Sequence, residues 1–68
     1  KITGYRELSQ DEINAMNKSK ELANQVGDFI DELEKNGYVD KCWLAIAKTD
    51  LQKAFMSLTR SIAKPSTF

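Results

Sequence analysis

The sequence predicts an all-α fold, an antiparallel helical hairpin preceded by a short N-terminal segment. Two long stretches carry apolar residues at every third or fourth position, which is the period of a helix with one buried face. Each stretch begins at a residue suited to cap free backbone amides. The linker between them, residues 36–39, is short enough to make the two helices antiparallel neighbours. We expect the 68 residues to form a single domain.

The first helix is expected to start at the capping box Ser9-Gln10-Asp11-Glu12 and to run to about Lys35. Before it, residues 1–8 lack a convincing period, and we expect an extended segment or one short helical turn. Asn36-Gly37 predicts a left-handed stop after the helix, and Gly27 indicates a close approach of another backbone. The apolar stripe of this helix comprises Ile13, Met16, Ala23, Val26, Phe29, Ile30 and Leu33.

The second helix is expected from Asp40, which caps it, to Pro65, which cannot continue it. Its buried stripe is predicted to comprise Leu44, Ala47, Leu51, Ala54, Phe55, Leu58 and Ile62. A second, uncharged stripe lies beside the first and comprises Ala45, Thr49, Gln52, Met56, Thr59 and Ala63. A helix face that only meets water usually carries charge. We therefore expect this helix to have two partners, one in its own chain and one in a neighbouring copy.

The small size of the chain favours self-association. A chain of 68 residues lies near the lower limit at which a core can stabilise a monomer without disulfides, a metal or oligomerisation. The single cysteine, Cys42, excludes an intrachain disulfide, and the absence of His makes a zinc site improbable. Trp43, Phe55 and Met56 cannot all be covered within one hairpin. We expect a homo-oligomer that needs no metal or cofactor.

Charge is divided unevenly along the chain although its net value is zero. Residues 1–39 carry five basic and eight acidic groups, and residues 40–68 carry five basic and two acidic groups, giving −3 and +3. Complementary halves should attract one another, which argues against duplex DNA as a partner. No apolar run could span a membrane, and the chain shows no export signal, although its first residue is not Met. These features indicate a cytosolic protein.

The residues usually recruited for catalysis are missing or scattered. The chain has no His, and its Asp and Glu residues in the first helix are spaced around a solvated face. Cys42 is better explained as a small buried residue near the turn than as a reactive thiol. Its glycines form no phosphate-binding loop. We expect a protein that is not an enzyme.

Lys20 is the irregular residue, because it follows Ile13 by seven positions and so falls inside the predicted apolar stripe. Its ammonium group either reaches solvent, pairs with an acidic neighbour, or binds a phosphate. Tyr5 could stack on a nucleobase, or anchor the N-terminal segment. Arg60 could pair with the acidic first helix, or bind an anion.

Three segments of the chain resemble the phage-encoded anti-CBASS sponge proteins. They are Gly4-Tyr5-Arg6-Glu7-Leu8-Ser9, residues 43–52 (WLAIAKTDLQ) and residues 55–65 (FMSLTRSIAKP). The resemblance covers nearly the whole chain. It implies a helical hairpin that assembles as a hexamer in the host cytoplasm, sequesters cyclic oligonucleotide messengers and does not cleave them.

The resemblance also implies site residues. The family binds cyclic dinucleotides, such as 3′,3′-cyclic GMP-AMP, with a stacking Tyr and a Lys fifteen residues later, positions that Tyr5 and Lys20 occupy here. Some members bind cyclic trinucleotides at a separate site between subunits, for which Arg60 is the candidate. Phe68 is a further candidate by its position alone. The alternative hypothesis is a helical hairpin that mediates protein interaction or oligomerisation and has no nucleotide ligand.

Overall fold

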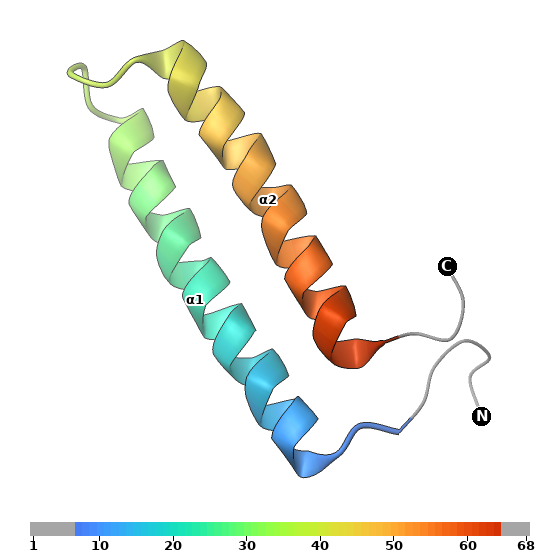
Figure 1. Ribbon diagram of the computed structural model, residues 1–68. Helices are drawn as coiled ribbons and strands as arrows, with labels where there is room; N and C mark the ends of the chain where they lie inside the picture. Colours follow the sequence, from blue (N-terminus) through green and yellow to red (C-terminus); the bar gives the residue numbers. More distant parts are fainter. Residues whose placement is uncertain (1–6, 65–68) are drawn as a thin grey trace.

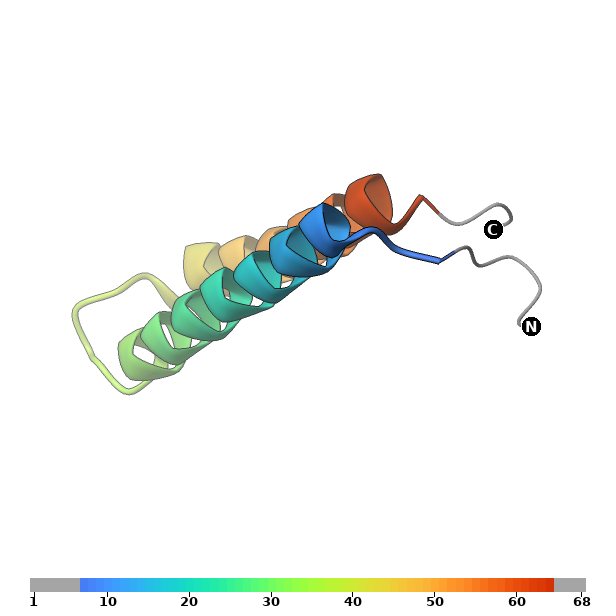
Figure 2. The ribbon, with the colours of Figure 1, turned by 90° about the horizontal axis from the view of Figure 1, so that it is seen from below.

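The protein is a pair of antiparallel helices joined by a short loop (Figure 1). The computed structural model describes residues 7–64. Helix α1 spans Gln10–Glu34 and helix α2 spans Lys41–Ala63. The view turned by 90° shows the same two helices lying side by side along their length (Figure 2). The predicted all-helical hairpin is confirmed.

The start of α1 is a capping box, as the sequence predicts. The Ser9 hydroxyl oxygen accepts a hydrogen bond from the Glu12 amide at 3.1 Å. The Glu12 carboxylate accepts one from the Ser9 amide at 2.8 Å. Asp11 and Glu12 also place negative charge at the positive end of the helix dipole. Two amides that helix geometry leaves without carbonyl partners are thereby satisfied.

The end of α1 differs from the prediction. Lys35 caps the helix in a right-handed conformation, and the Asn36 amide donates to the Leu33 carbonyl at 3.0 Å. Gly37 has no left-handed φ, and among residues 7–64 the non-glycine residue with a positive φ is Lys64. The predicted left-handed stop at Asn36-Gly37 is therefore wrong. A tight last turn and side-chain donors satisfy the free carbonyls instead.

Lys41 is the most important of these donors. Its ammonium group donates to the Glu34 carbonyl at 2.6 Å and to the Asn36 carbonyl at 2.8 Å. The last turn of α1 contains no basic residue of its own, so Lys41 supplies the positive charge that a helix C-terminus favours. The first residue of α2 thus fastens the loop to the end of α1.

Both ends of α2 agree with the sequence. The Asp40 carboxylate accepts from the Trp43 amide at 3.1 Å, so Asp40 is the N-cap. Lys64 ends the helix in the left-handed region with φ 47°, and its amide donates to the Arg60 carbonyl at 2.8 Å. The helix therefore stops at Ala63, just before the proline predicted to end it. None of the helices in residues 7–64 has the length and apolarity needed to cross a bilayer.

The core is a narrow seam between the helices. Ile30 and Ser19 are buried, each 6% exposed, and the remaining seam residues are half-buried. Those half-buried residues are Met16, Ala23, Val26 and Leu33 on α1, and Leu44, Lys48, Leu51, Phe55, Thr59 and Ile62 on α2. Their spacing of three and four residues is that of two helices packed along one seam.

The seam on α2 is rotated from its predicted position. Ala47, Ala54 and Leu58 are exposed, and Lys48 and Thr59 take their place. Lys48 fits because its stem packs along the seam while its ammonium group reaches the Glu34 carboxylate at 3.2 Å. Apolar side chains are consequently left over on both flanks of the hairpin.

The exposed aromatic and large apolar residues confirm that one chain is not enough. Trp43 is 68% exposed, Met56 66% and Phe29 56%, whereas Phe55 is half-buried. The prediction that Phe29 belongs to the buried stripe is therefore wrong for a single chain.

Two further predictions about single residues are also wrong. Cys42 is exposed rather than buried. At Gly27, none of the described atoms lies within 4 Å of the position that a Cβ would occupy, so the predicted close approach of another backbone is absent within this part of the chain.

Candidate functional site

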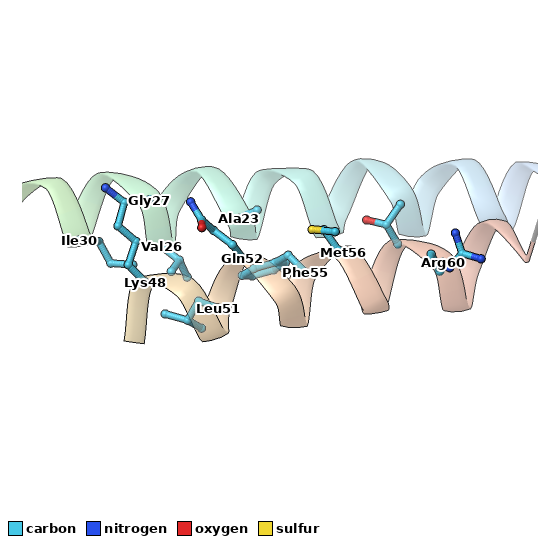
Figure 3. Close-up of a pocket in the computed structure, with 11 residues that line it drawn as sticks. Ala23, Val26, Gly27, Ile30, Lys48, Leu51, Gln52, Phe55, Met56 and Arg60 are labelled. Atoms are coloured by element: carbon cyan, nitrogen blue, oxygen red, sulfur yellow. The ribbon is translucent and has the colours of Figure 1, made fainter. Parts of the chain in front are cut away.

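An open groove runs between the helices on one flank of the hairpin, with a volume of about 700 Å³ (Figure 3). It is lined by Ala23, Val26, Gly27 and Ile30 of α1 and by Lys48, Leu51, Gln52, Phe55, Met56, Thr59 and Arg60 of α2. Its volume lies within the usual range for small-ligand sites. Most of the lining is aliphatic or aromatic, so the groove offers an apolar floor.

Cations stand at both ends of this groove. Lys48 lies near the loop, where it pairs with Glu34, and Arg60 lies at the other end (Figure 3). Gln52 and Met56 lie between them. The charge of Lys48 is partly balanced inside the chain, since the two charged atoms are 3.2 Å apart. An apolar floor with cations at its ends is chemically suited to a ligand that joins flat rings to negative charge.

Lys20 lies at the edge of the seam rather than within it. Ser19 is the buried residue at this level of α1, and Lys20 is exposed. The prediction that Lys20 occupies the apolar stripe is thus wrong by one position around the helix. Lys20 precedes Gly27 by seven residues, so both lie on the same side of α1, and Gly27 lines the groove. The Lys20 side chain therefore starts from the groove side of the hairpin.

Lys20 and Arg60 lie at similar heights along the two helices. The Glu34–Lys48 ion pair fixes the register near the loop. Lys20 is fourteen residues before Glu34, and Arg60 is twelve residues after Lys48. At about 1.5 Å of rise per residue, both lie roughly 20 Å from that ion pair in the same direction. Two of the predicted site residues thus share the end of the groove that is remote from the loop.

The other two predicted site residues, Tyr5 and Phe68, lie outside the described residues. Lys48 is a groove residue that the sequence reasoning missed. Its spacing was the available signal, because Leu44, Lys48 and Leu51 follow one another at intervals of four and three residues. Within residues 7–64, no group of three or more acidic or Cys side chains is arranged to hold a metal ion.

Comparison with known proteins identifies the family. Residues 1–63 match the family described as Acb2/Tad1, hairpin domain, and this match ends at the last residue of α2. Anti-CBASS protein 2 of Pseudomonas phage JBD67 is 31% identical across an alignment of 99 residues, which covers 96% of this chain and 92% of that protein. The resemblance to anti-CBASS proteins is thereby confirmed, and the chain belongs to the Acb2/Tad1 hairpin family.

Proposed function

We propose that this chain is a phage anti-CBASS protein, a single hairpin domain that binds and sequesters cyclic dinucleotides such as 3′,3′-cyclic GMP-AMP in the host cytoplasm. The observation that carries the proposal is the position of Lys20. It is exposed on the groove side of α1, and it stands fifteen residues after Tyr5, the spacing that the family uses for phosphate and base.

The chemistry of the ligand favours a site shared by two copies. A cyclic dinucleotide has two bases and two phosphates related by an approximate two-fold axis. One Tyr5 and one Lys20 are too few to contact all four groups. A two-fold interface doubles both residues, so each base gains a stacking face and each phosphate an ammonium group. In a hexamer, this arrangement would repeat three times.

Binding of this kind requires no reaction. Charge-assisted hydrogen bonds to phosphate and stacking on bases hold a ligand without activating a water molecule. The chain contains no His to act as a general base near neutral pH. We therefore propose sequestration rather than cleavage. A second site for cyclic trinucleotides would use Arg60 and Phe68.

Isothermal titration calorimetry with 3′,3′-cyclic GMP-AMP tests the proposal. Lys20→Ala and Tyr5→Ala are expected to weaken binding by more than about tenfold, because a hydrogen bond to a charged group contributes roughly 1.5 to 3 kcal/mol. Lys18→Ala is the matched control, since Lys18 is also an exposed α1 lysine and pairs with Glu21 at 3.7 Å. Lys18 lies two residues from Lys20, on a different face of the helix.

Unchanged affinity in both Lys20→Ala and Tyr5→Ala would remove the case for this site. Sequestration and hydrolysis are separated by heating the loaded protein and analysing what is released. Intact cyclic dinucleotide is expected, and a linear product would contradict the proposal.

The alternative function is a protein-interaction or oligomerisation hairpin without a nucleotide ligand. The exposure of Phe29 and Trp43 favours this alternative, since large apolar side chains in water often mark a protein interface. In that case, cyclic nucleotides should produce no change in melting temperature, and Lys20→Ala should behave like the wild-type chain.

A further inference from the structure

The uncharged stripe of α2 is nearly symmetric in sequence. Its members follow one another at alternating intervals of four and three residues: Ala45, Thr49, Gln52, Met56, Thr59 and Ala63. Alanines stand at its two ends, threonines stand next to them, and Gln52 and Met56 form the centre. Reversing the order about position 54 exchanges Ala with Ala, Thr with Thr, and Gln with Met. A surface with this property can pair with an inverted copy of itself.

The stripe is available for such pairing in a single chain. Ala45, Thr49 and Gln52 are exposed, Met56 is 66% exposed, and Thr59 and Ala63 are half-buried. The alternating spacing is that of a coiled-coil seam, and small residues at its ends permit two helices to approach closely.

We infer that two copies of this chain pack α2 against α2 in antiparallel orientation along this stripe, around a two-fold axis near position 54. Ala45 then lies opposite the partner's Ala63, Thr49 opposite the partner's Thr59, and Gln52 opposite the partner's Met56. The proposed function requires only that copies be paired. This inference names the surface that pairs them, and it does not depend on a nucleotide.

The groove supplies a place for the partner's central side chain. Gly27 and Gln52 both line the groove, and they lie within about one helical turn of each other in height when counted from the Glu34–Lys48 ion pair. The partner's Met56, placed opposite Gln52, would therefore enter the groove close to Gly27. None of the described atoms lies within 4 Å of a Cβ built at Gly27, so the space is open. A flexible Met side chain is well suited to fill it.

The charges beside the stripe are compatible with this pairing. Symmetry places Arg60 near the partner's Lys48. Within one chain, the Lys48 ammonium group already pairs with Glu34 at 3.2 Å. A carboxylate therefore stands beside the two cations in each half of the interface, so like charges do not meet unscreened.

Size-exclusion chromatography with light scattering, without nucleotide, tests the inference. Met56→Glu buries a charge at the centre of the interface and is expected to reduce the mass of the assembly at least twofold. Ser57→Glu is the matched control, because it adds the same charge to the next, exposed residue of α2 and should leave the mass unchanged. Circular dichroism should show the same helix content in both variants, since Met56 is 66% exposed in the single chain.

Gly27→Leu provides a second test that does not add charge. Leucine is a better helix former than glycine, so α1 should remain intact while the added side chain fills the groove. The mass of the assembly is again expected to fall. A monomeric wild-type chain, or masses that are the same for Met56→Glu, Gly27→Leu and wild type, would overturn the inference.

Disulfide trapping tests the orientation. In a Cys42→Ser background, Thr49→Cys mixed with Thr59→Cys under oxidised glutathione should form a mixed covalent dimer. Thr49→Cys alone should not, because antiparallel pairing separates the two copies of position 49 by roughly 15 Å along the helix axis. A Thr49→Cys homodimer, or no mixed dimer, would contradict the pairing.

Titration of the same variants with 3′,3′-cyclic GMP-AMP separates the two proposals. If wild type binds no nucleotide but Met56→Glu still reduces the mass, the interface stands and the proposed function fails. If wild type binds nucleotide and Met56→Glu leaves the mass unchanged, the interface fails alone.

Discussion

The two helices differ in how much of their surface is free of charge. α1 carries charge at 9 of its 25 positions, and this charge covers most of the surface outside the seam. α2 carries charge at 5 of 23 positions and has a second stripe without any. The difference indicates that α1 needs one partner, whereas α2 is built for two. The seam and the uncharged stripe can therefore be tested separately.

The largest effect on stability is expected from the seam. Ile30 is the buried hydrophobic residue of the described core, at 6% exposure, so Ile30→Ala should lower the free energy of unfolding by roughly 2 to 4 kcal/mol. In a chain this small, that loss is a large part of the total stability. Thermal unfolding followed by circular dichroism measures it.

Phe29→Ala provides the comparison for Ile30→Ala. Phe29 is the preceding residue and is 56% exposed, so its truncation should destabilise the single hairpin less than Ile30→Ala does. An equal or larger loss would mean that the flank bearing Phe29 is buried in the assembly and contributes as much as the seam.

The next effect concerns the caps that start the two helices. Asp40→Ala removes the acceptor for the Trp43 amide and should lower the free energy of unfolding by about 1 kcal/mol. Asp40→Asn should retain most of this stability, because the amide oxygen can accept the same hydrogen bond. Urea denaturation midpoints compare the variants, and equal midpoints for Asp40→Ala and wild type would contradict the cap.

Gly27→Ala is expected to act in the opposite direction. Alanine is favoured over glycine inside a helix by about 1 kcal/mol, and a Cβ at this position meets open space in the single chain. The melting temperature should therefore rise at protein concentrations where the chain is monomeric. A fall under those conditions would show that the space beside Gly27 is occupied within the chain.

The smallest effect is expected from the Glu34–Lys48 ion pair. Both side chains are partly exposed, at 44% and 42%, so a double-mutant cycle should give a coupling below about 1 kcal/mol. Because exposed charges are screened by salt, the coupling should shrink further in about 1 M NaCl. A coupling that is large and independent of salt would indicate that this pair is buried in the assembly.

The elements of the fold could be predicted because their signals are local. Ser9, Glu12 and Asp40 form the predicted caps, and the short linker is sufficient to make the helices antiparallel. The left-handed stop was the exception. Asn36-Gly37 has the right residue types, but Lys41 satisfies the terminal carbonyls from the next helix, and the sequence of α1 alone gives no sign of this contact.

The rotation of the seam could not be predicted from periodicity. Two neighbouring stripes of α2 are both free of charge, apart from Lys48 between them, so hydrophobicity alone does not decide which one faces α1. The pairing of Lys48 with Glu34 and the burial of Ser19 favour the observed face. The same ambiguity placed Lys20 inside the stripe, one position from its actual place. Tyr5 and Phe68 stay predictions.

The hairpin is fastened unequally at its two ends. Near the loop, Lys41 holds the end of α1, the Glu34–Lys48 pair bridges the helices, and Ile30 is buried. Toward the other end, the buried position is Ser19, whose hydroxyl group contributes little apolar stabilisation. Amide hydrogen exchange should therefore be fastest at the end that carries Lys20 and Arg60, so that the helices separate there first, like the tips of tweezers.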